Sequence, residues 1–468
     1  MNGASVDPCQ GAPFDADSSC LSELHLVSDC ASSTVCFGGD KITIRDDYWG
    51  EYRNGSLVTM QVPNFASRSE DVAFSLNGSQ QCDEGYDGTA CTLCQDNWYP
   101  SEPLNCKTCP SAGWVISFTL LFVSLKIGLA FYSAHSAGVK SLEEMEAEWA
   151  GSTLSSLFKV AVTHCSVLGL LDDTPWTWSI MKHITGGASH VGSVWDVGQT
   201  AYCFSALGFW DIYRFNSLLG PALLLVGLLC GLTCAARGRR IFAKDLGGLG
   251  FAAVFREATM TVLVVLAYTF LVKLIVTQFQ VLSCFDLVPS VGDSSSLLAF
   301  NPTVSCWPEG YTGIAIILIV VYSAALCYLN GYVLYANRHR LDEFDVRIQY
   351  AFLYKGFTDK HYYWGFVLLM RRFALGVIGT LLPQSYNAVK SSCLVSVVLI
   401  VSTTVHTREQ PFEQESINAL ESASLAIALL TILCSLYLRT SYNDFTHTSL
   451  EAESVTAFAA IANILLGE

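Results

Sequence analysis

Long apolar segments constrain this chain more than any other feature. A helix needs about 20 apolar residues to cross a bilayer, and we expect such spans at 113–134, 154–171, 217–236, 258–280, 311–335, 363–382, 388–405 and 419–438. A shorter ninth segment covers 453–466. Only 14% of the residues are charged, against about 25% in soluble proteins. The sequence therefore predicts a membrane all-α fold over residues 111–468, a bundle of about eight or nine transmembrane helices.

Residues 1–110 have a different composition, rich in cysteine and in acidic residues. Nine of the 18 cysteines lie before residue 110, together with 16 Asp and Glu and 5 Lys and Arg. Cysteine at this density is typical of small disulfide-rich domains in oxidising compartments. The acidic charge excludes nucleic acid as a partner, because phosphate binding needs basic patches. We therefore predict a small disulfide-rich ectodomain over residues 1–110, with no cofactor.

The two ends of the chain suggest a fragment of a longer protein. Residues 1–7 lack the basic and apolar parts of a signal peptide, although a disulfide-rich domain needs export. At the other end, the apolar segment 453–466 stops before it reaches the length of a span. We expect natural segments before and after this chain.

The cysteines predict disulfide bonds rather than a metal site. The pairs Cys91/Cys94 and Cys106/Cys109 have zinc-ligand spacing, but an oxidising compartment favours disulfides. The odd number before residue 110 makes Cys203 the expected tenth partner. The cysteines expected in disulfides are Cys9, Cys20, Cys30, Cys36, Cys82, Cys91, Cys94, Cys106, Cys109, Cys203, Cys284 and Cys306, the last two with each other. Those expected as buried thiols within spans are Cys165, Cys230, Cys234, Cys327, Cys393 and Cys434.

Basic residues predict the orientation of the helices. They gather in the loops 236–256 and 337–362, whereas the loop 281–310 has no Lys or Arg. By the positive-inside rule the two basic loops are cytoplasmic, which places the ectodomain and the loops 172–216 and 281–310 outside. The N-glycosylation sequons of the ectodomain are at Asn54 and Asn77. We expect a plasma membrane or a secretory or ciliary membrane, with lipid around the helices.

Ionisable side chains inside the predicted spans are the candidate functional residues. Charge is costly within a bilayer, so such residues mark internal partners, wet cavities or ion pathways. These residues are Lys126, Lys159, His164, Lys273, Arg371, Arg372 and Glu421. Glu421 enters the membrane from the same side as Arg371 and Arg372, which makes it their candidate partner. Snorkelling to an interface is the alternative for Lys273 and the two arginines.

Several short motifs resemble a known family. The segment Cys82-Asp83-Glu84-Gly85-Tyr86-Asp87-Gly88, with the cysteines that follow it, resembles a laminin/EGF-like or ephrin-receptor-like module over 82–109. In the membrane half the resembling motifs are Leu353-Tyr354-Lys355-Gly356-Phe357, Tyr363-Trp364, Arg371-Arg372 and Gln410-Pro411-Phe412. Together they resemble protist and algal multi-pass proteins described as transient-receptor-potential-like or G-protein-coupled-receptor-related. This chain departs at Gly365, where that family often has Glu, so no role of that acid carries over.

Three functions fit this pattern, and none of them is enzymatic. The sequence has no Gly-x-Ser-x-Gly, no His-Glu-x-x-His and no phosphate-binding glycine motif. The first hypothesis is a cation channel-like or sensory membrane protein, which the resemblance and the intramembrane charges support. The alternatives are a receptor or adhesion protein whose ectodomain binds an extracellular protein, and a structural subunit of a larger membrane assembly. The partners expected besides lipid are further copies of the chain or other membrane subunits.

Overall fold

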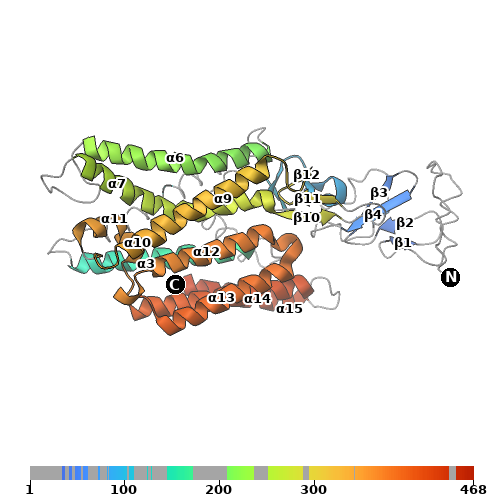
Figure 1. The fold of residues 1–468 in the computed structure, drawn as a ribbon. Coiled ribbons are helices and arrows are strands. Elements are labelled where there is room, and N and C mark those ends of the chain that lie inside the picture. The colour runs from blue at the N-terminus through green and yellow to red at the C-terminus, as the bar shows by residue number, and fades with distance from the viewer. Residues whose placement is uncertain are drawn as a thin grey trace, which may run out of the picture. The chain divides into compact units, whose positions relative to one another are not determined.

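A computed structural model gives the fold of the chain (Figure 1). It describes residues 145–171, 208–236, 251–287, 295–341, 343–441 and 449–467, with Ser124, Gly128 and the strands and turns between 34 and 109 named below. The chain divides into two compact units. The first contains 1–110, 202–206 and 281–308, and the second contains 111–201, 207–280 and 309–468.

Short antiparallel strands make up the described N-terminal part of the first unit. β1 (Thr34–Cys36), β2 (Ile42–Ile44) and β5 (Val72–Ala73) form one sheet, and β3 (Tyr48–Arg53) pairs with β4 (Ser56–Gln61). β6 (Tyr86–Asp87) pairs with β7 (Leu93–Cys94), and β8 (Trp98–Glu102) pairs with β9 (Asn105–Thr108). Disulfides join Cys82 to Cys91 and Cys94 to Cys106. Strands this short bury little apolar surface, so covalent bonds supply the stability that a core would otherwise give.

The segment predicted as the outer loop 281–310 contains a three-stranded antiparallel sheet. Its strands are β10 (Cys284–Leu287), β11 (Ser295–Leu298) and β12 (Asn301–Ser305). A disulfide between Cys284 and Cys306 closes the sheet, as expected from their shared loop. Phe285 and Leu287 are buried while Asp286 between them is exposed, which is the alternation of a strand with one covered face. We name this element the outer sheet.

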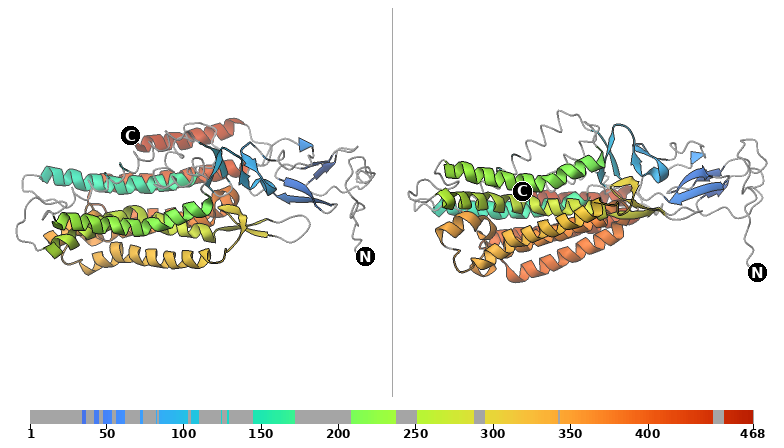
Figure 2. Two further views of the ribbon diagram at one scale, coloured as in Figure 1. Left: turned by 90° about the horizontal axis from the view of Figure 1, so that it is seen from above. Right: turned by 45° about the horizontal axis from the view of Figure 1, so that its top comes forward.

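The second unit is helical. Its helices are α3 (Met145–Leu168), α6 (Phe209–Ala236), α7 (Phe251–Leu266), α8 (Val272–Phe279), α9 (Tyr311–Cys327), α10 (Val333–Ala336), α11 (Phe344–Tyr354), α12 (Trp364–Leu381), α13 (Gln384–Glu409), α14 (Glu415–Ser441) and α15 (Ser449–Gly467). Figures 1 and 2 show the long helices side by side, with successive ones running in opposite directions. This arrangement is the one expected of a polytopic membrane protein.

Six helices among the described residues are long and apolar enough to cross a membrane. They are Phe209–Ala236, Val254–Leu282, Tyr311–Ala336, Trp364–Leu381, Val389–Glu409 and Glu415–Leu438. The predicted spans 154–171 and 453–466 form shorter apolar helices, Ser155–Leu168 and Ser454–Asn463, and the predicted span 113–134 lies outside the described residues. The prediction of eight or nine spans is therefore not confirmed. Polar side chains such as Lys159 and Thr163 shorten the apolar stretch of α3.

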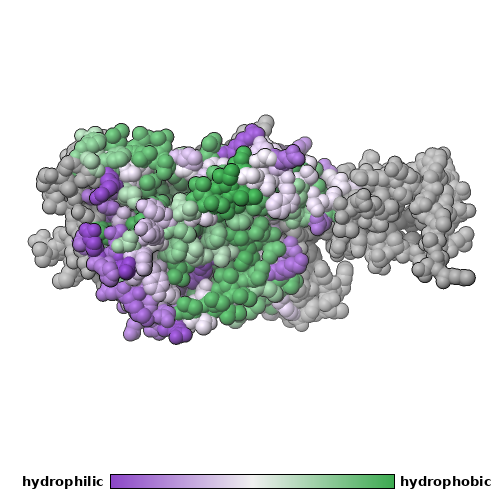
Figure 3. All heavy atoms as spheres, in the orientation of Figure 1, coloured by the Kyte–Doolittle hydropathy of each residue, from purple (hydrophilic) through white to green (hydrophobic). Residues whose placement is uncertain are grey.

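The burial of these helices shows which of them would face lipid. In α6 and in α9–α10, 17% of the most apolar window is buried inside the protein, against 78% in Val254–Leu282. Figure 3 shows the result as a broad hydrophobic band across the helical unit, with hydrophilic residues gathered at its α11 end. The helix formed by α7 and α8 is therefore the centre of the bundle, and the exposed apolar side chains of α6, α9 and α13 form a surface that suits lipid.

Glycines bring α6 close to α7. A Cβ atom on Gly227 would lie 2.6 Å from the side chain of Leu263, and one on Gly231 would collide with Thr259. The two glycines are four residues apart and so lie on one face of α6. Small residues at such spacing let helix backbones approach in lipid, where no hydrophobic force drives helices together.

Two of the spans contain a π-helical turn, and the two turns contact each other. η6 (Ala267–Leu271) lies between α7 and α8, and η8 (Tyr328–Tyr332) lies between α9 and α10. A π turn widens the helix, redirects the side chains around it and is frequent at functional sites. Here η6 buries Tyr268 and η8 buries Asn330, each 1% exposed.

Candidate functional site

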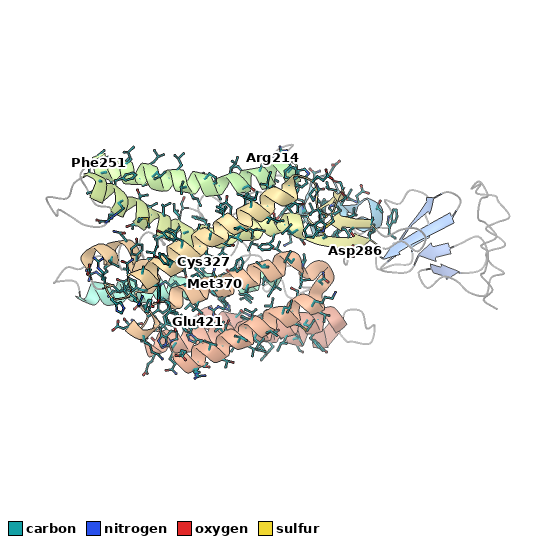
Figure 4. The ribbon with its side chains drawn as sticks, viewed as in Figure 1. Arg214, Phe251, Asp286, Cys327, Met370 and Glu421 are labelled. Carbon is teal, nitrogen blue, oxygen red and sulfur yellow. A yellow bond between two sulfur atoms is a disulfide. The ribbon has the colours of Figure 1, made fainter. Side chains whose placement is uncertain are left out.

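An ion pair lies inside the helical unit. Arg371 on α12 donates a hydrogen bond from Nη2 to Oε1 of Glu421 on α14, and the two side chains are 6% and 1% exposed. Figure 4 labels Glu421 on α14 and Met370, the neighbour of Arg371, on α12. The structure thus brings together two residues expected to be partners. Removing one member of such a buried pair costs about 3–5 kcal/mol, because it leaves the other charge uncompensated.

Arg372, the next residue, is buried, and no carboxylate in the described part of the chain pairs with it. It is 7% exposed, and its guanidinium carbon lies 6.0 Å from the centre of the Tyr268 ring. Its Nε and the hydroxyl of Tyr268 are both buried without a hydrogen-bond partner. A desolvated cation–π contact contributes about 2 kcal/mol, less than the several kcal/mol that burial of an ion costs. Arginine keeps its proton in proteins, so this charge needs a further partner.

Lys159 on α3 is another fully buried basic side chain. It is 0% exposed, donates to the carbonyl oxygen of Lys355 over 3.4 Å, and lies 4.7 Å from the centre of the Phe357 ring and 5.5 Å from that of Phe352. The ring of Phe352 in turn packs edge-on against Tyr268, with centroids 5.1 Å apart. Lys159, Phe352, Tyr268 and Arg372 therefore form a continuous row from α3 to α12, which we name the cation–aromatic row.

Two histidines lie within electrostatic range of Glu421. His164 on α3 is held at both ring nitrogens: Nε2 lies 3.2 Å from Oδ1 of Asn463, and Nδ1 lies 2.9 Å from the hydroxyl of Ser424. His406 on α13 donates from Nε2 to the carbonyl of Asn418 over 3.2 Å. Both imidazoles interact electrostatically with Glu421. The geometry at His164 fits a neutral ring protonated at Nε2, because an amide oxygen accepts and a hydroxyl donates.

Two loop segments meet beside the row, at residues 355–361 and 409–418, and we name them the loop clasp. Phe357 and Phe412 form an isolated antiparallel bridge, with their rings 4.9 Å apart. Asn418 fixes this bridge, because its Oδ1 accepts from the Phe412 amide over 3.0 Å and its Nδ2 donates to the Phe412 carbonyl over 2.9 Å. At the other edge Nε2 of His361 lies 3.1 Å from Oε2 of Glu409. The clasp supplies both Phe357 and the Lys355 carbonyl to Lys159.

Gly365 allows α11 to pack closely against α12. It is the second residue of α12, and a Cβ atom there would collide with the carbonyl oxygen of Leu353 at the end of α11. A glutamate would therefore not fit this packing. Phe352, the residue before Leu353, packs on Tyr268, so the close approach at Gly365 lies directly beside the row.

The remaining predicted residues are placed as follows. Lys273 lies on α8 and is half-buried. Cys36 lies in β1, and Cys109 also forms a disulfide. The predicted residues that lie outside the described ones are Lys126, Cys9, Cys20, Cys30, Cys203, Asn54 and Asn77.

The thiols within the spans are less buried than expected. Cys327 and Cys393 are exposed, whereas Cys165, Cys230, Cys234 and Cys434 are half-buried. The prediction of buried thiols is therefore wrong for Cys327 and Cys393, which stand on the outward faces of α9 and α13. A thiol tolerates that position because it behaves as a small hydrophobic group toward lipid.

Four residues of the site were not predicted as site residues from the sequence: Tyr268, His406, Asn418 and Asn463. Tyr268 counted as one more aromatic residue in an apolar run, although its hydroxyl needs a partner once buried. Asn463 and Asn418 could have been identified because each is a carboxamide near an apolar stretch. In lipid such a group usually has a hydrogen-bond partner on another helix. In the described part of the chain, no group of three or more His, Cys, Asp or Glu could hold a metal ion.

Comparison with known proteins finds a relative that is named for cysteine repeats. No family model matches the chain, and no solved structure matches it. Cysteine repeat modular protein A of Toxoplasma gondii is 29% identical in an alignment of 141 residues, which covers 28% of this chain and 4% of that protein. The chain thus spans a small fraction of that relative's length. This similarity supports a Cys-rich domain, and the six apolar helices support a polytopic membrane protein.

Proposed function

We propose that this chain is a sensory membrane protein, in which a change at the outer sheet alters the polar contacts inside the bundle. The observation that carries the proposal is the contact between the π turns η6 and η8. The outer sheet is inserted in the chain between the two helices that contain these turns: α8 leads into β10, and β12 leads into α9. A displacement of the sheet acts on both helices at once.

A chain of side-chain contacts leads from these turns to the loop clasp. Tyr268 of η6 packs on Phe352 of α11 and faces Arg372 of α12. Five residues after Phe352, Phe357 forms the bridge of the clasp. A shift of η6 against η8 would therefore move a ring that lies between Phe352 and the buried Arg372. Such a packed polar element has discrete arrangements rather than a continuous range, which is what a two-state sensor needs.

The orientation of the sensor follows from its basic loops. The positive-inside rule places the clasp in the cytoplasm and the outer sheet and Cys-rich region outside, in a plasma membrane or a secretory or ciliary membrane. We propose that the Cys-rich region, an EGF-like or ephrin-receptor-like module, binds an extracellular protein, and that the chain works without catalysis, as a homo-oligomer or with other membrane subunits. Trp307, which directly follows the outer sheet and is 59% exposed, offers a separate aromatic contact for a protein partner.

A sensor fits the central helix better than a channel does. The threonine hydroxyls of Thr261, Thr269 and Thr277 donate to carbonyls of the same helix over 2.8–3.0 Å. Hydroxyls satisfied in this way do not need water, whereas a cation pathway needs polar groups that replace the hydration shell of the ion. The transient-receptor-potential-like alternative therefore becomes one outcome of the test rather than the proposal itself.

The test uses the full chain in lipid nanodiscs and hydrogen–deuterium exchange. The Cys284→Ser/Cys306→Ser double variant opens the outer sheet, and Cys82→Ser/Cys91→Ser is the matched control, because it removes a disulfide that no span adjoins. We expect faster exchange in residues 355–361 and 409–418 in the first variant only. Changes confined to the outer sheet would favour a structural subunit. Cation uptake into proteoliposomes by the unmodified chain would replace the sensor with a channel.

A further inference from the structure

We propose that the helical unit binds a small inorganic anion between Arg372, Arg371 and Tyr268. This inference goes beyond the proposed sensory function and does not depend on it. It begins with donors that have no acceptor: Nε of Arg371, Nε of Arg372 and the hydroxyl of Tyr268 are all buried without a hydrogen-bond partner. Such groups are rare in folded proteins and indicate an occupant that the polypeptide does not supply.

The chemistry of the three groups points to an acceptor. A guanidinium has only donors, and a phenol next to two guanidinium groups is itself best used as a donor. The side chains that share this face of α12, Leu368, Leu369 and Leu375, are almost fully buried and offer no oxygen. Since no described residue supplies an acceptor to the three groups, we take the missing partner to be a bound group with lone pairs.

The charges distinguish an anion from water. Arg371 and Arg372 both keep their protons, and Glu421 pairs with Arg371. The hydroxyl of Tyr268 interacts electrostatically with all three groups, so they share one region. That region contains two positive charges and one negative charge. A water molecule would satisfy hydrogen bonds but leave the second positive charge uncompensated in a medium of low dielectric, whereas a monovalent anion removes both problems.

The size of the ligand follows from its surroundings. Tyr268 is 1% exposed, Leu369 0% and Arg372 7%. Packing of this kind excludes a lipid headgroup, so only a small anion of halide size is consistent with it. Chloride is the probe that matches this size and charge.

The experiment measures thermal unfolding of the purified full chain in nanodiscs, by intrinsic fluorescence. Sodium chloride replaces sodium gluconate at constant ionic strength, so screening stays fixed while the small anion is titrated. We expect the melting temperature to rise with chloride and then saturate, as binding to the folded state requires. Ion chromatography of the desalted, denatured protein gives an independent count of retained chloride, which we expect to be one ion per chain.

Three variants separate this site from general salt effects. The Arg372→Gln variant should lose the saturable rise in melting temperature, whereas Arg338→Gln should keep it. Arg338 is the matched control because its guanidinium carbon also lies over a tyrosine ring, 4.3 Å from the centre of Tyr335, but its side chain is exposed. Tyr268→Phe keeps the ring, removes the hydroxyl and should weaken the apparent chloride affinity about tenfold; it decides the matter if Arg372→Gln fails to fold. Identical melting in chloride and gluconate, or a rise that survives in Arg372→Gln or is unchanged in Tyr268→Phe, overturns the proposal.

Discussion

Neutralising Glu421 should destabilise this protein more than neutralising its partner Arg371. The Glu421→Gln variant leaves two buried arginines without a carboxylate, so its cost falls at the upper end of the range of about 3–5 kcal/mol for breaking a buried pair. In the Arg371→Met variant, Arg372 is still present as the next residue of α12. Its guanidinium can supply the positive charge that Glu421 has lost. We expect that cost at the lower end of the range.

The double variant, Arg371→Met/Glu421→Gln, tests the same reasoning from the other side. It removes both charges together, and replacing a buried pair by neutral groups of similar volume is often close to neutral. The double variant should therefore cost several kcal/mol less than the sum of the two single variants, and this difference is the coupling energy between the two residues in direct contact. Domains have about 5–15 kcal/mol of total stability, so either single variant should remove a large fraction of it.

The assay is reversible unfolding of the full chain from mild detergent into increasing dodecyl sulfate, followed by circular dichroism. The matched control is the exposed pair of Arg340 and Glu343, whose side chains are 61% and 50% exposed. Arg340 lowers the pKa of Glu343 by a hydrogen bond, so this pair is ionised at pH 7 and its contribution is lost only as the pH falls through that lowered pKa. Arg340→Gln should change stability little. Equal effects of Glu421→Gln and Arg340→Gln, or strict additivity in the double variant, would refute the reasoning.

Three further outcomes are expected. Gly365→Ala should cost about 1–3 kcal/mol, since its Cβ meets the Leu353 carbonyl; Gly313→Ala in α9, where nothing lies within 4 Å, should not destabilise, and equal melting temperatures of the two variants would contradict this. Asn418→Ala should speed amide exchange at Phe412 by releasing both of its backbone bonds; unchanged exchange there would show that the bridge holds without the side chain. Peptide mapping by mass spectrometry without reductant should find the linked pairs Cys82–Cys91, Cys94–Cys106 and Cys284–Cys306, and free thiols at these positions would contradict the fold of the first unit.

The apolar spans were predictable because their cause is local. A run such as 311–335 needs no partner to be recognised, and the structure places a helix at Tyr311–Ala336. The outer sheet was not predictable in the same way. β10 to β12 are four or five residues long, and strands of that length read as loop because their pairing is set by the disulfide and by contacts far apart in sequence.

The same difference between predictable and unpredictable features is found within the site. The ion pair could be predicted from the sequence, whereas the cation–aromatic row could not. Glu421 could be matched to Arg371 because both enter from one side at similar depth, which is a property of the chain order alone. The row could not be found, because Lys159 and Phe352 are distant in sequence and meet only after α11 has packed on α12 at Gly365. Because glycine has no side chain, Gly365 carries no polar or charged group from which this close packing could be predicted.

The polar contacts also have a structural role that follows from the solvent. In lipid, apolar side chains gain nothing by leaving the solvent for one another, so helix association depends on close packing and on polar partners. Arg371 and Glu421 join α12 to α14, while His164, through Ser424 and Asn463, joins α3 to α14 and α15. These bonds select one arrangement among several that the apolar surfaces would allow. The residues that fix the fold are therefore the ones that a sensor would need to rearrange, and a change in any of their bonds alters the packing of at least two helices.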